Sequence, residues 1–260
     1  MSEGFSVCIP THNNLEGLKL CLYSLKKYSE LKNEILIHVD GSKDETVEWL
    51  KENGYEFSFD EWKGACTGWN RTAERSTKDY LFICSDDMFV APDWDVNLSK
   101  WVRKDRIIVP QLVEPHPGSY PPVYNCGKHP SEFDEGRFVT YAKKIMKHEL
   151  KPHEFGGFIW HRDLFFEAEG FDEERFNPGD CSSCDLQLRI AHEHPELKFY
   201  MACDVIVYHY QRMALGKVPN IKELGTRNVR RFHEKWGFHI SDAYKMMRER
   251  FRKAMAEDAL

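Results

Sequence analysis

The sequence predicts an α/β protein with a single Rossmann-like, mostly parallel sheet that is flanked by helices and followed by a C-terminal helical extension. Short apolar runs alternate with amphipathic segments in the order β-α-β-α-β-α-β over residues 5–84. This alternation is typical of a parallel sheet with right-handed crossovers. A length of 260 residues allows one large domain or two small ones, and no composition change marks a strong boundary.

Each predicted element follows from the spacing of its apolar residues. The first strand ends at Pro10, and leucines then recur at helical spacing from Leu15 to Leu25. The predicted strands are 5–9, 34–39, 55–59, 80–84, 107–113 and 198–208. The predicted helices are 15–25, a helix that carries Val47 and Leu50 and stops at residues 53–54, and then 65–76, 138–149, 185–194 and most of 222–257. We expect one domain over residues 1–225, with a division near residue 113 where regular α/β structure gives way to loops, and a helical extension over 226–260.

Composition and charge exclude several classes of protein. Hydrophobic residues make up 42% and charged residues 30% of the chain, which is ordinary for a soluble globular protein. The net charge of −6 provides no overall attraction to nucleic acid. No apolar stretch approaches the roughly 18 residues of a membrane span, and the chain enters a strand without a signal peptide. We therefore expect a cytoplasmic protein.

Eight cysteines are scattered through the chain without a disulfide framework. Several of them lie in apolar runs, where a thiol acts as a small hydrophobic group. Cys181 and Cys184 form a single CxxC pair, but no second pair is present to complete a zinc site. The pattern favours a reducing compartment.

The strand at residues 80–84 runs almost directly into two adjacent carboxylates, Asp86 and Asp87. Ligands of open α/β sheets bind at the carboxyl ends of the strands, and paired carboxylates suit Mg²⁺ or Mn²⁺ carrying a diphosphate. The alternative is that the pair caps a helix beginning near Pro92. Polar groups also follow the first strand, at residues 10–13, and the second strand, at Asp40. These strand ends are expected to share one crevice with the aspartate pair.

Several segments resemble, in order, the motifs of family 2 glycosyltransferases of the GT-A fold. Residues 7–13 (VCIPTHN) resemble the opening strand and its P-T-H-N end, and residues 39–46 resemble D-D-G-S-x-D-x-T with one leading acid missing. Residues 68–73 are similar to the segment before the DxD strand, and Ser85-Asp86-Asp87 stands in place of the DxD with serine as its first residue. Residues 170–173 match G-F-D-E, and Phe232 with Lys235-Trp236-Gly237 resembles a C-terminal signature.

This resemblance implies a metal-dependent glycosyltransferase with a nucleotide-diphosphate sugar as donor, UDP or GDP being the expected nucleotides, and Mn²⁺ or Mg²⁺ as cofactor. It implies that residues 1–113 bind the nucleotide sugar and residues 114–225 the acceptor. The implied donor-binding residues are Pro10, Thr11, His12, Asn13, Asp40, Asn70 and Asp86. The implied metal ligands are Asp87, Asp86 and His209, the last at the end of a late strand. The metal would stabilise the charge that develops on the leaving diphosphate.

The general base is where the chain departs from the family pattern. Inverting members carry E-D-x-D-L after G-F-D-E, whereas this chain has Ser182-Ser183-Cys184-Asp185-Leu186. A serine hydroxyl cannot accept the acceptor's proton as a carboxylate does. The base is therefore expected at Asp185 or Asp180, although Asp185 can equally cap a helix. The other possibilities are a retaining enzyme or a chain that has lost activity.

On the acceptor side, Gly157 allows a close backbone approach, Asp172 lies in the G-F-D-E segment, and Trp160 is either a sugar platform or a core residue. The loop 114–130 is expected to fold over the donor or to be an ordinary surface loop.

Residues 227–253 carry nine lysines and arginines against three acids. An amphipathic helix there can contact an anionic membrane and a lipid-linked saccharide acceptor, or can simply pack on its own domain.

Two other functions remain open from the sequence. A nucleotidyltransferase would share the sheet and the metal-binding acids, but it should carry a glycine-rich basic loop after the first strand. Residues 10–13 do not form such a loop. A non-catalytic sugar-nucleotide or glycan-binding protein is the other possibility, because of the serines at 182 and 183.

Overall fold

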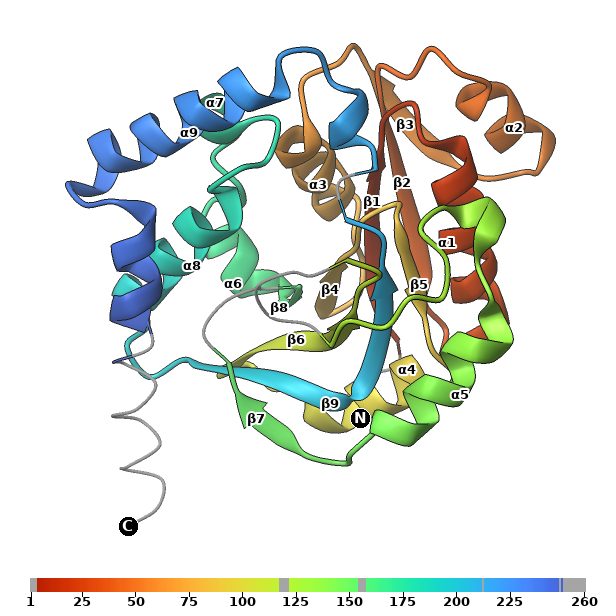
Figure 1. Ribbon diagram of the computed structural model, residues 1–260. Helices are drawn as coiled ribbons and strands as arrows, with labels where there is room; N and C mark the ends of the chain where they lie inside the picture. The colour runs from red at the N-terminus through yellow and green to blue at the C-terminus, as the bar shows by residue number, and fades with distance from the viewer. Residues whose placement is uncertain (1–3, 117–121, 154–157, 212, 248, 250–260) are drawn as a thin grey trace.

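The computed structural model describes residues 4–116, 122–153, 158–211, 213–247 and 249, and these form one mixed sheet with helices on both faces (Figure 1). The strand order is β3-β2-β1-β4-β8-β6-β9-β5, and β7 pairs with β9. The strands are β1 (Ser6–Thr11), β2 (Glu34–Asp40), β3 (Phe57–Asp60), β4 (Tyr80–Ile83), β5 (Met88–Val90), β6 (Arg106–Val113), β7 (Leu150–Pro152), β8 (Ile159–His161) and β9 (Lys198–His209).

The helices lie between these strands and at the end of the described chain. They are α1 (Leu15–Tyr28), α2 (Thr46–Glu52), α3 (Ala65–Glu74), α4 (Trp94–Trp101), α5 (Glu135–Ile145), α6 (Arg162–Glu167), α7 (Glu173–Phe176), α8 (Ser182–Glu193) and α9 (Ile221–Trp236), with 3₁₀ turns η1 (Pro130–Glu132) and η2 (Leu215–Lys217). The alternation predicted from the sequence over residues 5–84 is confirmed as β1 to β4 with α1, α2 and α3 between them.

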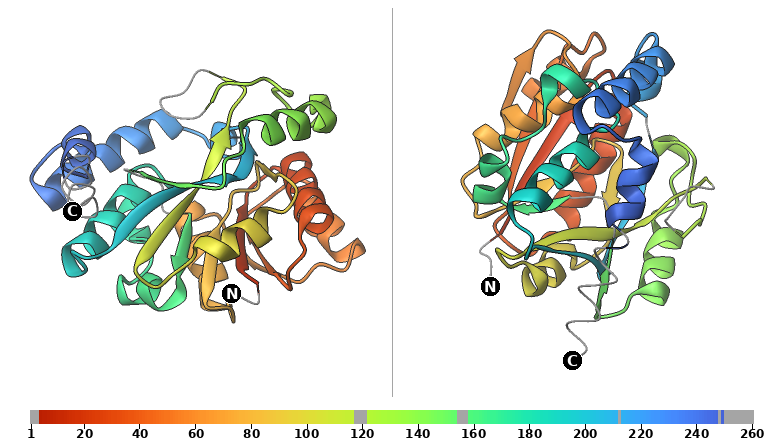
Figure 2. Two further views of the ribbon diagram at one scale, coloured as in Figure 1. Left: turned by 90° about the horizontal axis from the view of Figure 1, so that it is seen from below. Right: turned by 90° about the vertical axis from the view of Figure 1, so that its left-hand side faces the viewer.

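Alternating strand residues divide the core between the two faces of the sheet, as the two-residue period of a strand requires. Val7 and Ile9 pack with α1, α2 and α4 on one face, whereas Cys8 packs with α3, α6 and α8 on the other. Figure 2 shows these two helical layers on either side of the sheet. The N-terminal part of the sheet is parallel, with β2 and β4 both parallel to β1. As a result, the carboxyl ends of these strands meet at one edge.

Three strands of three residues each, β5, β7 and β8, were not predicted. Each pairs antiparallel with a longer strand, and β8 inserts between β4 and β6. Strands this short carry too few residues to display a periodicity. The effect on the candidate site is large, because the pairing of β5 with β9 sets Met88 opposite His209.

The C-terminal helices pack on the domain. Helix α9 ends at Gly237, which has the left-handed conformation (φ 74°) common after a helix. Phe232, Ala243 and Met247 are at most 3% exposed and belong to the core beside α8. Residues 250–260, where part of the predicted amphipathic helix falls, lie outside the described residues.

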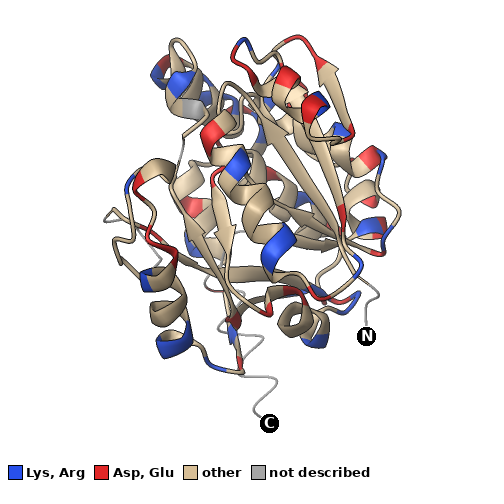
Figure 3. Ribbon diagram, turned by 90° about the vertical axis from the view of Figure 1, so that its right-hand side faces the viewer, with Lys and Arg blue, Asp and Glu red and all other residues tan. Residues whose placement is uncertain are grey.

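Within the described part, no helix combines the length and apolar character needed to cross a membrane. Basic and acidic residues are interspersed over the helices and loops in Figure 3.

Candidate active site

The carboxyl ends of four strands bring polar side chains to one cavity. Thr11 ends β1, Asp40 ends β2 and His209 ends β9, while Asp86 and Asp87 form the turn between β4 and β5. These five residues line a cavity that also receives residues from the loops after β3, α7 and β9. Its complete lining is Pro10, Thr11, His12, Asp40, Trp62, Gly64, Ala65, Trp69, Ser85, Asp86, Asp87, Pro178, His209, Ala214 and Val218.

Asp86 is 3% exposed and accepts a hydrogen bond of 2.7 Å from the Thr11 hydroxyl. Burial, followed by the charge of Asp87, raises the pKa of Asp86 to about 7. Two carboxylates this close cannot both ionise freely in a buried site. A positive charge at this edge of the sheet would therefore stabilise the pair.

Asp87 has one bonded and one open oxygen. Oδ2 accepts from the backbone N–H of Met213 at 3.2 Å. Oδ1 is buried and has no hydrogen-bond donor among the described residues, although Nε2 of His209 lies 3.5 Å away. Burial by itself would raise the pKa of Asp87, but the nearby His209 outweighs it and lowers that pKa.

Glu114 holds the imidazole of His209 from the other side. The Oε1 atom of this glutamate lies 2.9 Å from Nδ1 of His209, and the glutamate is 3% exposed. Burial would lower the pKa of His209, but Asp87 and Glu114 together raise it to about 10. The imidazole therefore sits between two carboxylates that favour a positive charge. Sequence reasoning missed Glu114 as a site residue, although it directly follows β6 at the same edge of the sheet.

These residues fit a divalent cation. Oδ1 of Asp87, which accepts no hydrogen bond from the described residues, and Nε2 of His209 form a pair of donor atoms that suits Mn²⁺. Glu114 contacts the other imidazole nitrogen, as a carboxylate usually does behind a histidine that binds a metal. The described residues contain no ready-made cluster of three metal-ligating side chains. This arrangement agrees with sites in which one or two protein ligands and the phosphates of the substrate share the metal.

The far end of the cavity is built around Asp40. Its carboxylate accepts from the backbone N–H groups of Lys63 and Gly64, each at 2.7 Å, and burial raises the pKa of Asp40. A ring nitrogen of His12 lies 2.6 Å from the backbone oxygen of Asp40. Trp62 lies 6.1 Å from the His12 ring, centroid to centroid, and is 40% exposed. The loop that Asp40 holds through Lys63 and Gly64 thus presents an aromatic side chain to the cavity.

Asn13 supports this end without lining the cavity itself. It has a left-handed backbone (φ 49°), its N–H donates to the Ser42 hydroxyl at 2.9 Å, and its Oδ1 accepts from the N–H of Lys43 at 2.7 Å. Lys217 of η2 donates to the Asn13 carbonyl. Asn13 therefore ties together the loops after β1 and β2 and the segment after β9.

Comparison with known proteins identifies the family. The family model described as glycosyl transferase family 2 matches residues 6–170. The chain belongs to glycosyl transferase family 2. None of the curated proteins matches it significantly.

Solved structures of glycosyltransferases share the fold. Residues 1–349 of TarS from S. aureus superpose with a TM-score of 0.56 at 13% identity, over 89% of this chain and 72% of that one. The same TarS fragment in complex with UDP-GlcNAc gives 0.59 at 12% identity, over 88% and 66%. GalNAc-T7 with UDP, GalNAc and Mn²⁺ gives 0.60 at 19% identity over 88% of this chain and 48% of that one, so the chain spans about half of GalNAc-T7. The predicted GT-A fold is confirmed.

Several residues predicted for the site have other environments in this family 2 protein. The Nδ2 atom of Asn70 donates to the Phe171 carbonyl at 2.9 Å and to Glu173 at 3.0 Å, so this side chain joins α3 to α7 rather than lining the cavity. Asp172 caps α7, and its carboxylate lies 3.0 Å from Nζ of Lys235. Both side chains serve as tethers between helices.

Asp185 is fully buried. Its carboxylate lies 2.9 Å from Nε of Arg189 and 2.8 Å from Nζ of Lys235, and it accepts from Nε1 of Trp236 at 2.9 Å. These three donors leave no face of the carboxylate open to an acceptor. This environment argues against Asp185 as a base. The alternative that Asp185 caps a helix is wrong, because it lies in the first turn of α8, whose N-cap is Cys181.

Trp160 is 1% exposed and packs against Phe165 with ring centroids 6.4 Å apart. A side chain that stacks on a sugar needs an exposed ring face, and Trp160 has none. Trp160 is therefore a core residue. Gly157 and residues 117–121 of the 114–130 loop lie outside the described residues.

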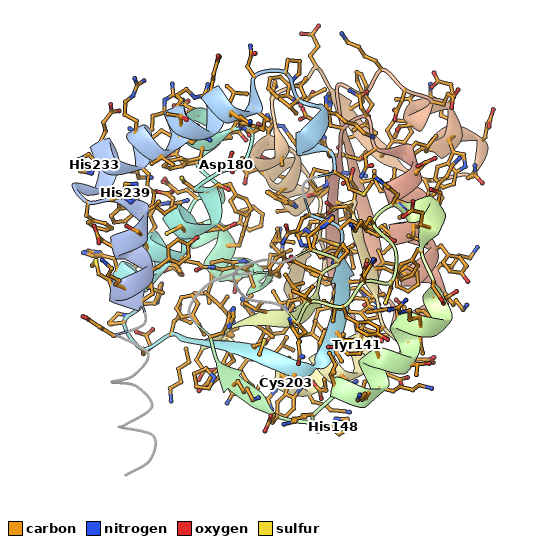
Figure 4. The ribbon with its side chains drawn as sticks, in the orientation of Figure 1. Tyr141, His148, Asp180, Cys203, His233 and His239 are labelled. Atoms are coloured by element: carbon orange, nitrogen blue, oxygen red, sulfur yellow. The ribbon has the colours of Figure 1, made fainter. Side chains whose placement is uncertain are left out.

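Asp180 lies close to the cavity. It follows Pro178, a cavity residue, by two positions, and Figure 4 shows it below α9 on the side of α3. Its carboxylate lies against Gly225 of α9, where a Cβ atom would come within 3.0 Å of Oδ2. Ser182 is 1% exposed, and its hydroxyl donates to the Gly179 carbonyl at 2.6 Å.

Sequence reasoning missed a group of lining residues that come from loops. They are Trp62, Pro178, Ala214 and Val218. The exposed Trp62 within a charged segment was the signal available for one of them. The others are small apolar side chains whose position depends entirely on where the loops fold.

Proposed function

We propose that this protein transfers a sugar from a nucleotide-diphosphate sugar, with UDP as the first nucleotide to test, to a hydroxyl group of a saccharide or lipid-linked saccharide, with Mn²⁺ or Mg²⁺ bound. The observation that supports this most is the open Oδ1 of Asp87 facing His209 in the same cavity as Asp40. One end of that cavity favours a cation and the other offers hydrogen-bonding and aromatic groups. A nucleotide diphosphate needs both.

Charge complementarity supports the metal dependence. Asp86, Asp87 and Glu114 are three buried carboxylates near the position where a diphosphate would bind. Without a cation they would repel it. A divalent ion held by Asp87 and His209 would supply Lewis-acid stabilisation to the leaving diphosphate. Asp86 would remain bonded to Thr11 and fix the floor of the cavity.

UDP is favoured by the solved structures that share the fold. TarS is described in complexes with UDP and with UDP-GlcNAc, and GalNAc-T7 with UDP, GalNAc and Mn²⁺. In this chain, Asp40, His12 and Trp62 would contact the base and ribose. GDP-sugars are the alternative donors to test in parallel.

For the acceptor, we propose Asp180 as the general base. A carboxylate near the cavity can take the proton from the attacking hydroxyl as the bond to the anomeric carbon forms. The serines at 182 and 183 lack this capacity, and Asp185 is enclosed by three donors. A product that retains the anomeric configuration would remove the need for such a base.

The deciding experiment is a donor screen with a matched pair of variants. UDP- and GDP-sugars would be incubated with the protein and Mn²⁺, and nucleotide release would be followed for the wild type, Asp87→Asn and Asp163→Asn. Asp163 is a control carboxylate on α6 with a side chain 68% exposed. We expect Mn²⁺-dependent release in the wild type and in Asp163→Asn, and its loss in Asp87→Asn.

Two other outcomes would contradict the proposal. Mn²⁺-dependent binding of a donor without any release or transfer would indicate a sugar-nucleotide-binding protein. Equal release by wild type and Asp87→Asn would show that Asp87 does not hold the catalytic cation. NMR of the product anomer then decides between inversion and retention.

A further inference from the structure

A second groove, of about 410 Å³, adjoins the donor cavity between α3, α7 and α9. The two hollows share Trp62 and Pro178 on their linings. Trp62 is 40% exposed, which is unusual because tryptophan side chains are highly buried on average. The groove therefore offers a second molecule a route to the donor cavity.

Two arginines of α9, Arg227 and Arg231, form one wall of this groove. Residues four apart on a helix lie on the same face, so the two guanidinium groups are neighbours. Burial, followed by the charge of Arg231, lowers the pKa of Arg227. The charge of Arg231 thus contributes to the shift, although burial is its larger cause.

Each guanidinium is anchored through part of its N–H groups only. Arg227 donates from Nη2 to the Asn177 carbonyl and, at 3.1 Å, to Oδ1 of Asn228. Arg231 donates from Nη1 to the carbonyls of Glu174 at 3.2 Å and Arg175 at 3.1 Å. Among the described residues, no acceptor engages Nη1 of Arg227 or Nη2 of Arg231. Both groups are held in place with donors to spare, so little side-chain entropy would be lost on binding a ligand.

Neither arginine has a carboxylate partner within 4 Å in the described part of the chain, which separates them from Arg230 and Lys235 of the same helix. On the same helix, Arg230 lies 3.5 Å from Glu234, and Lys235 lies 3.0 Å from Asp172.

The remaining charged residues of the groove do not cancel this pair. Lys63 adds a third cation, whose Nζ lies 3.7 Å from Asp60. Glu173 and Glu174 also line the groove and keep their negative charges, so the lining carries three cations and two acids. On a protein with a net charge of −6, a cluster in which cations outnumber acids is a local feature that favours an anion.

We propose that the groove between α3, α7 and α9 binds an anionic group of the acceptor, a phosphate or a sugar carboxylate, between Arg227 and Arg231. This inference rests on the proposed glycosyl transfer and adds the substrate class: the acceptor is a phosphorylated or uronic-acid-containing saccharide. Its charged group would lie beside α9 while its reacting hydroxyl reaches past Trp62 and Pro178 to the donor cavity. Guanidinium groups suit this role because their planar N–H pairs match both phosphate and carboxylate oxygens.

Binding is tested first, without any transfer. The arginine side-chain N–H signals of ¹⁵N-labelled protein would be titrated with inorganic phosphate and, separately, with methyl glucuronide. A double variant carries both Arg227→Gln and Arg231→Gln. The single variant Arg230→Gln is the control on the same helix. We expect saturable shifts of the Arg227 and Arg231 signals in the wild type and in Arg230→Gln. The two probes also show which of phosphate and carboxylate the groove prefers.

Transfer is tested next, with neutral, phosphorylated and uronic-acid-containing saccharides as acceptors. We expect the double glutamine variant to raise KM for the charged acceptor by about 10- to 100-fold, the range for losing hydrogen bonds to a charged group, and to leave donor KM and release unchanged. Because both arginines also bind backbone carbonyls, thermal unfolding is measured alongside. Arg227→Lys with Arg231→Lys, which keeps the charges but loses the planar geometry, should give an intermediate KM.

The outcomes separate this inference from the proposed function. Absence of saturable shifts with both probes, or equal losses in Arg230→Gln, overturns the anion site. The anion site is also overturned if the wild type prefers neutral acceptors and the double glutamine variant keeps that preference. Absence of metal-dependent donor release contradicts glycosyl transfer itself, whereas the phosphate and glucuronide titrations would still report on the groove.

Discussion

Oδ1 of Asp87 and Nε2 of His209 face each other across 3.5 Å, although 122 positions separate the two residues in the sequence. The short strand β5 creates this approach, because it pairs with the end of β9 immediately after Asp87. The carboxylate oxygen has no hydrogen-bond donor among the described residues. The pairing of three residues thus sets the spacing of the two protein atoms best suited to hold a cation.

Glu114 should act as a positioning residue for this pair. Replacing it with glutamine keeps the shape but removes the negative charge beside Nδ1 of His209. Loss of an outer-shell carboxylate typically weakens metal binding by about 10–100-fold, so we expect Glu114→Gln to need that much more Mn²⁺ for half-maximal donor release. The control is Glu149→Gln, a partly exposed glutamate 3.3 Å from Lys151. A Mn²⁺ dependence identical to the wild type would rule out this role.

Asp180 and Asp185 should respond differently to substitution. If Asp180 is the base, Asp180→Asn should lower kcat for transfer by about 10²–10⁴-fold and leave the free energy of unfolding nearly unchanged. Donor hydrolysis by water provides a second readout, because it should be affected less than transfer. Unaltered transfer in Asp180→Asn would exclude Asp180 and favour a retaining mechanism.

Asp185→Ala should instead destabilise the protein. The substitution leaves the charges of Arg189 and Lys235 without their buried partner, and breaking a buried ion pair costs about 3–5 kcal/mol. Urea unfolding measures this loss. A variant that unfolds like the wild type but has lost transfer would show that the buried network is catalytic after all.

Much of the donor half could be predicted from the sequence because its strands are buried and its ligand-binding groups follow them directly. Asp40, Asp87 and His209 each stand at the end of an apolar run, and the parallel arrangement of the N-terminal strands brings the first two to one edge of the sheet. What the sequence could not show is burial. Asp185 and Trp160 occupy motif-like positions, but their environments are decided by α9 and by the insertion of β8.

The site residues that loops contribute could not be predicted from the sequence either. The cavity position of Trp62 depends on the hydrogen bonds that hold Lys63 and Gly64 on Asp40. The anion groove depends on α7, four residues long, ending next to α9. Neither relation leaves a periodic signal in the sequence.

Glu135 at the start of α5 should make stability depend on pH. Burial opposes its ionisation, but hydrogen bonds from Tyr28 at 2.5 Å and Lys27 at 2.9 Å lower its pKa. Because the folded-state pKa lies below the unfolded value of about 4.3, the contribution is present above that pH and is lost as pH falls through the folded-state pKa. For a partly exposed group we expect about 0.2–1 kcal/mol.

Urea unfolding of the wild type and Glu135→Gln measures that contribution. The difference between the two should be present at pH 6 and should shrink toward pH 3.5. A difference that stays constant with pH would mean that the glutamate stabilises α1 against α5 through packing rather than through its charge.

Gly68 of α3 should couple the stability of the sheet to donor binding. A Cβ atom at this position would come within 2.5 Å of the Cβ atom of Pro10, which lines the donor cavity. Gly68→Ala must therefore push α3 away from the end of β1, and overpacking of this kind costs about 1–3 kcal/mol. Because Pro10 is displaced, we expect the donor KM to rise as well. Gly136→Ala in α5 is the matched control, since its Cβ would meet only Oδ1 of Asp134, at 3.6 Å, and should be neutral or stabilising by about 0.5–1 kcal/mol. A Gly68→Ala variant with unchanged stability and donor KM would show that α3 can shift without moving the loop that carries Thr11 and His12.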